Sequence, residues 1–571
     1  MNNNKVFITF SLSALLIAGM TVSCKENFLE RQPSGVFNEQ GLTNLKGIEG
    51  TLIGAYATLN GRTDAYLGGG SNWVFGSIGS DEAYKGSEQG DWTDLNQVEY
   101  YDVQPSNAAV YQKWETSFDG IGMANTVLRM LPKATDLTDD DRNRIALEAR
   151  FLRGWHHFEG VRTFRNIPYI DENVTDYAAL SSEGPIWTQI EDDFKAAYGE
   201  LPDKMPNVGR ANKWAAAAYL AKVYLHQRKY AEAKPVLDDI IANGVTANGV
   251  KYGLNEKFHD NFRIAGKNSK ESVFATQSSV KDGAQGFNGN YENTLNYPHG
   301  AGDKPGGCCG FFQPSQNLVN SFKTDANGLP LLETFNQTDI PNDQALKSDE
   351  PFTPYAGTLD PRLDWTVGRR GIQYLDWGQH PGRSWIRDAS WGGPYSPKKN
   401  VYYKEDVSNN YQPGTWGQAT SSLNINLVRF ADVLLWAAET EAELGNLTKS
   451  LEYVNQVRAR AANEEGFVRN PDGTPAANYK ISPYPSFPGK EYALQAIQFE
   501  RKLELAMEGH RHFDLVRWGI AAPVLNAYIA GEVNNIPHLQ GATFDAGKDE
   551  YYPKPANYVS RMPNVKQTQG Y

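Results

Sequence analysis

Flat aromatic rings and planar charged groups stand close together in two glycine-rich parts of the chain. The first part contains Trp73, Asp81 and Trp92. The second part is a short run that contains Arg383, Trp385, Trp391 and Tyr395. Indole rings can stack on the weakly polar C–H faces of sugars, and planar carboxylate or guanidinium groups can pair with two hydroxyls at once. These residue types predict a site that holds a carbohydrate.

Within this set, Trp92 and Trp385 are predicted to be stacking platforms, with Asp81 and Arg383 as partners for the hydroxyls. A secondary group of candidate contacts consists of Trp73, Trp391 and Tyr395. The alternative for each aromatic residue is a ring that pins its loop to the body of the protein, because burying such a ring stabilises by about 2–3 kcal/mol. The group is therefore more informative than any single member.

Two adjacent cysteines, Cys308 and Cys309, follow the glycines at 306 and 307. Adjacent α-carbons lie about 3.8 Å apart, which is below the usual range for a disulfide, so a bridge between them would be strained and rigid. Such a ring could form a small apolar platform at a binding site. The alternatives are a pair of buried free thiols or ligation of a metal, although no set of Cys and His residues is spaced to complete a metal site. We expect neither a metal nor a cofactor.

A hydrolytic enzyme is the main alternative to a binding protein. A glycoside hydrolase needs one acid and one base or nucleophile about 5–10 Å apart. Asp81, Glu82 and Asp91 could supply such a pair, but the chain contains 67 Asp and Glu residues, so this signal is unspecific. The sequence contains no phosphate-binding loop, metalloprotease helix motif or nucleophile elbow. We expect a protein without catalytic activity.

The amino-terminal residues have the pattern of a secreted lipoprotein. Lys5 precedes an apolar run over residues 6–20, and Cys24 follows shortly after it. Crossing a membrane takes about 20 apolar residues, so this run is too short for a transmembrane helix. We expect residues 1–23 to be a signal peptide and Cys24 to carry the lipid. Thr21 stands where the usual cleavage motif prefers Leu, which leaves secretion with an unmodified Cys24 as the alternative.

Composition limits the partners of this protein. The 571 residues carry a formal charge of −12, and the predicted signal peptide contains only one charge, that of Lys5. Nucleic acids and anionic lipid surfaces both require a basic surface, so the charge argues against them as partners. We expect membrane contact through the amino-terminal lipid only. With three cysteines in all, packing and not a disulfide framework must hold the fold.

Apolar residues at three- and four-residue spacing predict a series of helices. They cover residues 139–165, 186–200, 212–227, 230–243, 428–444, 447–462 and 492–507. Gly244 and Gly445 stand where two of them should end, because glycine enters the left-handed conformation without steric cost.

Two of these helix pairs have the spacing of tetratricopeptide repeats. The pair at 212–243 fits well, whereas the pair at 428–462 places Glu441 and Ser450 where the repeat expects an aromatic residue and an alanine. Between them, residues 244–426 are rich in Gly, Pro and Asn, and residues 464–490 form a second irregular segment. Long ordered loops are usually functional, so the binding site is expected there.

Several motifs give the chain a strong resemblance to the SusD/RagB family. The longest is FERKLELAMEGHRHFDLVRWG at residues 499–519. The others are the amino-terminal lipoprotein pattern, DPRLD at 360–364, RFADVLL at 429–435 and NQVRAR at 455–460. The resemblance extends over nearly the whole chain after the predicted signal peptide.

This resemblance implies a mainly α-helical fold, with a tetratricopeptide-like scaffold that carries long irregular loops. Its parts would be residues 24–243, 244–426 and 427–571, with the first and last joined in one compact body. It also implies an outer-membrane lipoprotein that faces the cell exterior, caps a SusC-like TonB-dependent transporter and captures oligosaccharides without altering them. A peptide cargo, as in RagB-like members, is the alternative.

The charged residues of the longest motif are predicted to be structural. Glu508, Arg511, Asp514 and Arg517 recur every three residues, which would place neighbours within reach on one helical face. We expect a salt-bridge network that anchors loops, with no role in ligand chemistry.

Overall fold

The computed structural model describes residues 39–62, 67–300, 302–414 and 419–571. The predicted signal peptide and the predicted lipidation site at Cys24 lie outside these residues. Within the described part of the chain, no helix is both long enough and apolar enough to cross a membrane.

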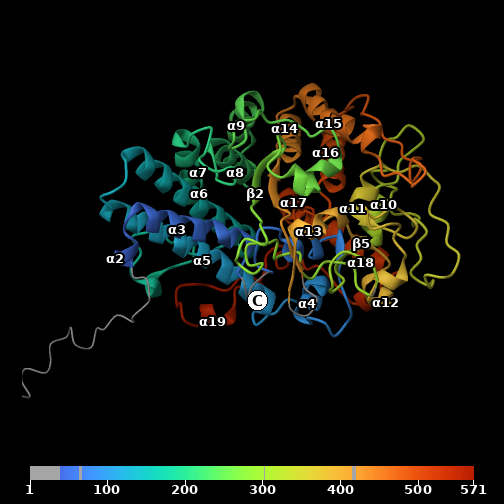
Figure 1. Cartoon of the computed structure of the whole chain (residues 1–571), viewed down its shortest axis with the longest axis horizontal. Helices are drawn as coiled ribbons and strands as arrows, with labels where there is room; N and C mark the ends of the chain where they lie inside the picture. Colours follow the sequence, from blue (N-terminus) through green and yellow to red (C-terminus); the bar gives the residue numbers. More distant parts are fainter. Residues whose placement is uncertain (1–38, 63–66, 301, 415–418) are drawn as a thin grey trace, which may run out of the picture.

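Helices that follow one another in the sequence pack side by side and form a continuous stack (Figure 1). The first part of the stack consists of α3 (Leu45–Ala57), α5 (Ala108–Met130), α6 (Asp139–Phe164), α7 (Trp187–Glu200), α8 (Lys213–His226) and α9 (Tyr230–Asn243). The second part consists of α14 (Phe430–Glu443), α15 (Leu447–Ala461) and α16 (Lys490–Glu504), and α14 packs against α9. The predicted mainly α, tetratricopeptide-like scaffold is confirmed.

Every predicted helix is present, with ends that differ by at most three residues from the expected positions. Gly445 closes its helix with a left-handed φ of 89°, as expected. Gly244 follows α9 with φ −58°, so the predicted reason for this glycine is wrong. A Cβ at Gly244 would lie 2.4 Å from the carbonyl oxygen of Ile240 and 2.5 Å from the ring of Tyr252. Close approach, and not a left-handed turn, requires glycine there.

Short elements connect and cover the stack. The short helices are α2 (Glu39–Leu42), α4 (Asp94–Tyr100), α10 (Gln316–Ser321), α11 (Leu363–Thr366), α12 (Ala389–Gly392), α13 (Val407–Asn410), α17 (Arg511–Trp518), α18 (Ala521–Glu532) and α19 (Ala556–Val559). The strands form antiparallel pairs: β1 (Ala83–Gly86) with β3 (Phe311–Pro314), β2 (Ser272–Thr276) with β8 (Ile425–Arg429), β4 (Val367–Gly368) with β5 (Ser396–Pro397), and β6 (Tyr411–Pro413) with β7 (Ala419–Ser421). Because these pairs join distant segments, they hold the long loops against the stack.

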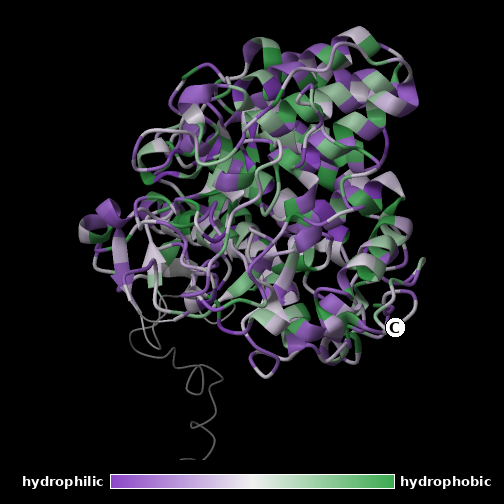
Figure 2. Cartoon of the chain, turned by 90° about the vertical axis from the view of Figure 1, so that its right-hand side faces the viewer, coloured by the Kyte–Doolittle hydropathy of each residue, from purple (hydrophilic) through white to green (hydrophobic). Residues whose placement is uncertain are grey.

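The main hydrophobic core runs through the stack and includes residues from Ile48 to Tyr552. Hydrophobic and hydrophilic residues alternate along the helices in Figure 2, as expected for helices with one buried face. A smaller cluster of buried side chains lies under the loops and contains Tyr297, Tyr374, Trp385 and Tyr402. The loop region therefore has its own aromatic support.

Buried ion pairs connect α16 to the loops and to α15. Arg362 Nη1 lies 2.7 Å from Glu500 Oε1, and Arg458 Nη1 lies 2.8 Å from Glu500 Oε2. Arg429 Nη1 lies 2.9 Å from Glu504 Oε1. These arginines belong to the motifs at 360–364, 429–435 and 455–460, so the motifs that are far apart in the sequence meet in one structural network.

The residues of the motif at 499–519 are also structural, which confirms that prediction. Glu508 pairs with Arg429 and Lys399, Arg511 pairs with Asp81, and Arg517 pairs with Glu439. Only Asp514 and Arg517 pair with each other within the helix, at 2.8 Å. The expected single helical face is wrong, because α17 begins at Arg511 and Glu508 precedes it.

Candidate functional site

Three loop segments that sequence analysis singled out meet at one surface, which we call the loop junction. It consists of residues 87–92, residues 299–310 without 301, and residues 383–391. The amide of Ser87 donates to the carbonyl oxygen of Gly310 at 2.5 Å. The amide of His299 donates to the carbonyl oxygen of Trp385 at 2.9 Å. Arg387 Nη1 donates to Ser87 Oγ at 3.0 Å. Backbone and side-chain hydrogen bonds thus hold the three segments together.

The centre of the loop junction is a partly exposed guanidinium between two carboxylates. Arg387 contacts Glu88 and Asp91 at 2.5 Å each, and its side chain is 27% exposed. The side chains of Glu88 and Asp91 are 48% and 32% exposed. All three groups are planar and can therefore bind pairs of hydroxyls. Sequence analysis did not assign a role to Arg387 or Glu88, although Arg387 stands only two residues after Trp385.

Three of the predicted site residues lie at the surface of the loop junction. Trp92 is half-buried, with part of its ring packed on the main core. Arg383 is exposed and forms no ion pair with a described residue. Cys308 is half-buried and disulfide-bonded to the buried Cys309, so of the three alternatives for these cysteines the structure has the bridge. Segments that carry an indole, a small apolar ring and an exposed guanidinium therefore meet at the loop junction.

Two predicted tryptophans support this surface from below. Trp385 is only 5% exposed and packs edge-on against Tyr374 and His380. Trp391 is 7% exposed and stacks on His538, with the ring centroids 3.6 Å apart. The expectations that Trp385 is a stacking platform and that Trp391 is a secondary ligand contact are wrong in this structure, because both rings are buried among aromatic neighbours.

Trp73, Asp81 and Tyr395 do not reach the surface, so their predicted contact with a ligand is also corrected. Trp73 is buried against Phe311 and Phe312. Tyr395 is buried, and its hydroxyl donates to Gln316. Both residues support the loops from inside the protein.

Asp81 belongs to the structural ion-pair network. It lies 2.8 Å from Lys502 Nζ and 2.8 Å from Arg511 Nε. Burial alone would raise the pKa of Asp81, but the charges of Arg511 and Lys502 lower this pKa well below its ordinary value. The residue is therefore a fixed anion inside the protein and is not available to hydroxyls of a ligand.

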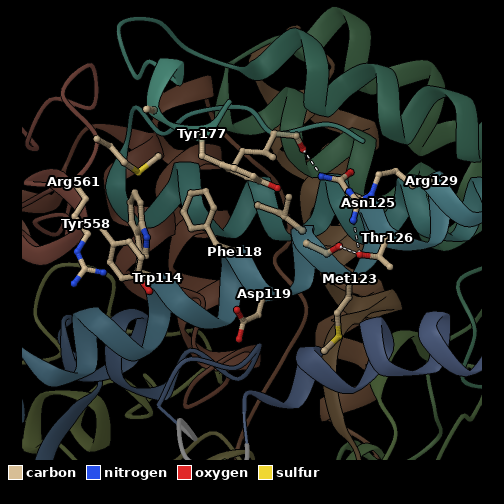
Figure 3. A pocket seen from close by; sticks show the side chains of 15 residues that line it. Trp114, Phe118, Asp119, Met123, Asn125, Thr126, Arg129, Tyr177, Tyr558 and Arg561 are labelled. Atoms are coloured by element: carbon tan, nitrogen blue, oxygen red, sulfur yellow. Dashed lines mark hydrogen bonds between the residues drawn. The ribbon is translucent and has the colours of Figure 1, made fainter. Parts of the chain in front are cut away.

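A separate cavity of about 740 Å³ lies between α5, the segment at 170–178 and α19. Figure 3 shows Trp114, Phe118, Tyr177 and Tyr558 grouped around this space. None of the residues predicted from the sequence lines it. Because α5 was not among the helices predicted from the sequence, its aromatic residues did not stand out as a group.

The described residues contain no group of three or more His, Cys, Asp or Glu side chains that could hold a metal ion. The site thus consists of aromatic, guanidinium, carboxylate and disulfide groups on loops that a helical repeat scaffold carries. These features define a tetratricopeptide-like stack whose loops carry a candidate binding site.

Comparison with known proteins identifies the family. Residues 270–571 match the SusD family, and residues 56–225 match a family described as "Starch-binding associating with outer membrane". The chain therefore belongs to the SusD/RagB family, as its motifs predicted.

Individual relatives are similar over most of their length. SusD-like protein P25 of Formosa agariphila is 25% identical over 88% of this chain and 88% of its own. The crystal structure of a SusD superfamily protein from Bacteroides vulgatus has a TM-score of 0.68 at 22% identity and covers 92% of this chain and 99% of its own. Surface glycan-binding protein A from Bacteroides thetaiotaomicron, in complex with laminarihexaose, has a TM-score of 0.67 at 18% identity. The match covers 92% of this chain and 99% of that protein. These two structures share the fold of this chain.

Proposed function

We propose that this protein captures oligosaccharides at the loop junction. The proposal rests on the loop junction itself, where hydrogen bonds join the segments that carry the half-buried Trp92, the Cys308–Cys309 ring, the exposed Arg383 and the ion-paired Arg387. Rings and planar groups of this kind suit C–H faces and hydroxyls. Structural neighbours whose names record binding of laminarin or laminarihexaose support a glycan cargo.

The cellular role proposed here follows from membership of the SusD/RagB family. The protein is anchored by lipid at Cys24 to the outer membrane, faces the cell exterior and delivers its cargo to a SusC-like TonB-dependent transporter. The family description that mentions the outer membrane supports this placement.

The carboxylates of the loop junction suit binding better than catalysis. A glycoside hydrolase needs one carboxyl group that donates a proton and a second group that acts as base or nucleophile. Glu88 and Asp91 both contact the guanidinium of Arg387 at 2.5 Å. This guanidinium stands between the two carboxylates, where a hydrolase would hold the scissile bond, and this supports a protein that binds glycans without cleaving them.

Calorimetric titration with defined oligosaccharides and a peptide mixture tests the proposal. We expect binding of at least one glycan and no product after prolonged incubation. Trp92→Ala should weaken this binding at least tenfold, or by about 1.4 kcal/mol, because the stacking surface is lost. Phe287→Ala is the control, since Phe287 is an exposed aromatic residue outside the loop junction. Heat from peptides alone would reassign the cargo, and equal affinities of Trp92→Ala and the wild type would reject this site.

A further inference from the structure

The cavity between α5 and α19 is strongly apolar and opens at the surface. Trp114 and Phe118 form part of its wall, with ring centroids 4.4 Å apart. Met123 and Tyr177 also line it and are 39% and 54% exposed. Large apolar side chains seldom stay this exposed when nothing covers them, so the cavity has the character of a docking site.

The apolar surface continues from the cavity onto α3. Ile53 of this helix is 57% exposed. A Cβ on the next residue, Gly54, would lie 3.5 Å from Met123 Sδ, which places α3 directly beside the cavity mouth. An occupant of the cavity therefore lies close to the first helices of the described chain.

Two arginines flank this apolar space. Arg129 and Arg561 line the cavity and lie at opposite ends of it in Figure 3. Arg129 donates to the hydroxyl of Thr126, and neither arginine pairs with a carboxylate of the described residues. The remaining charge at the cavity, Asp119, lies 3.0 Å from Arg62. The cavity thus suits an apolar group with negative charges on both sides, in a chain whose net charge is −12.

A segment of this same chain has that pattern. Residues 26–30 read Glu-Asn-Phe-Leu-Glu, so Phe28 and Leu29 stand between Glu26 and Glu30. The segment precedes the first described residue, Glu39, by a linker that can span up to about 30 Å. Gly54, beside the cavity mouth, lies nine residues along α3 from Leu45, a rise of about 14 Å. The linker is long enough for residues 26–30 to reach the cavity.

We propose that residues 26–30 dock in this cavity. Phe28 and Leu29 enter the space between the rings, and Glu26 and Glu30 lie beside Arg129 and Arg561. Docking would place Cys24 within a few residues of the folded body and so set the distance between the lipid anchor and the helical stack. The proposal does not depend on the glycan site, because the cavity shares no residue with the loop junction.

Photo-cross-linking in the complete chain tests the docking. Phe28 is replaced by p-benzoylphenylalanine, which reacts with nearby C–H bonds and especially with methionine. We expect cross-links within one chain to Met123, Tyr177 or Met562, identified by mass spectrometry. Val36 replaced in the same way is the control and should give at least tenfold fewer links to these residues. Links from position 28 to other parts of the body would overturn the proposal.

Charge reversal tests the contribution of the arginines. We expect the double variant Glu26→Lys/Glu30→Lys to reduce the cross-links from position 28 at least fivefold, because like charges then face each other. Combining it with Arg129→Glu/Arg561→Glu should restore most of the cross-linking, a rescue that general loss of folding cannot produce. Links between two chains that grow with protein concentration would assign the cavity to a second copy instead. Loss of the cross-links when an oligosaccharide is added would assign the cavity to a glycan. Links between two chains, or loss of the links with oligosaccharide, would each reject docking of residues 26–30.

Discussion

At the residue scale, the neighbours Asp81 and Glu82 show how contacts set the charge of a buried carboxyl group. Asp81 contacts Lys502 and Arg511, whereas Glu82 accepts hydrogen bonds from Ser77 Oγ and the amide of Met507. Burial, together with the charge of Asp81, raises the pKa of Glu82 to about 8. Glu82 is therefore protonated in the folded protein at neutral pH and ionised in the unfolded chain.

The raised pKa of Glu82 predicts a specific pH dependence of stability. Because the folded form retains a proton that the unfolded form loses, Glu82 lowers the free energy of unfolding progressively between pH 4.5 and 8, by up to about 1.4 kcal/mol per pH unit. Glu82→Gln should accordingly gain stability relative to the wild type over this range, with no further gain above pH 8. Urea unfolding at pH 5, 6, 7 and 8 measures the difference.

Asp81→Asn is the matched comparison for Glu82→Gln. The pKa of Asp81 is lowered, so its stabilising contribution is fully present above its ordinary pKa and is lost only in more acidic solution. Because the charge of Asp81 also raises the pKa of Glu82, Asp81→Asn lets Glu82 ionise at lower pH, so the destabilisation that it causes should become smaller from pH 5 to 8. Effects of both substitutions that stay the same at all four pH values would show that Glu82 is ionised in the folded state.

The Cys308–Cys309 bridge predicts the number of free thiols. We expect a Cys24→Ala variant, denatured without reductant, to contain no free thiol and to contain two after reduction. Reaction with a thiol reagent in denaturant measures both values. Two free thiols before reduction would remove the disulfide ring from the proposed glycan site.

At the element scale, buried arginines connect helices that the hydrophobic pattern alone leaves unrelated. Arg458 of α15 pairs with Glu500 of α16 and donates to the carbonyl oxygens of Ser482 and Gly328 in two loops. Each buried charge needs its partners, because an unpaired ion in the interior is very unfavourable. Arg458 therefore fixes the position of α15, α16 and both loops at once.

Arg458→Gln should destabilise the protein by about 3–5 kcal/mol, because it leaves the buried charge of Glu500 with one partner fewer. Lys449→Gln is the control on the same helix, since Lys449 pairs with Glu452 in an exposed position and should contribute less than about 1 kcal/mol. Thermal or urea unfolding of both variants measures the two effects. Equal, small losses would show that the network does not hold these elements.

At the scale of the whole molecule, segments near the two ends of the described chain depend on each other. Asp81 pairs with Lys502 and Arg511, the amide of Tyr552 donates to the carbonyl oxygen of Thr163, and β2 pairs with β8. The helical parts and the long loops therefore share one main core.

This organisation predicts that the chain unfolds as one unit. Differential scanning calorimetry of the complete chain should show a single transition, and residues 427–571 expressed alone should fail to fold. Two separate transitions would instead support independent domains at the boundaries that the sequence suggested.

The sequence by itself determined the family, the repeat scaffold and most of its helices. The spacing of apolar residues predicted α6 to α9 and α14 to α16, although α6, α8 and α14 are buried over much more than one face. It did not reveal α5, whose segment mixes Gly, Ser, Thr and Asn with its aromatic residues and is held by packing on both sides. The charged residues of the motif at 499–519 were correctly assigned a structural role, although they do not share one helical face.

Only the tertiary structure decided which of the candidate site residues reach the surface. Trp92 and Trp385 look alike in the sequence, yet one is half-buried at the loop junction and the other packs under it against Tyr374 and His380. Asp81 looked available but lies between two cations inside the protein. The physical reason is that exposure and charge pairing depend on contacts that form only in the folded chain, within the same loop for Trp385 and between distant segments for Asp81, and local composition does not encode those contacts.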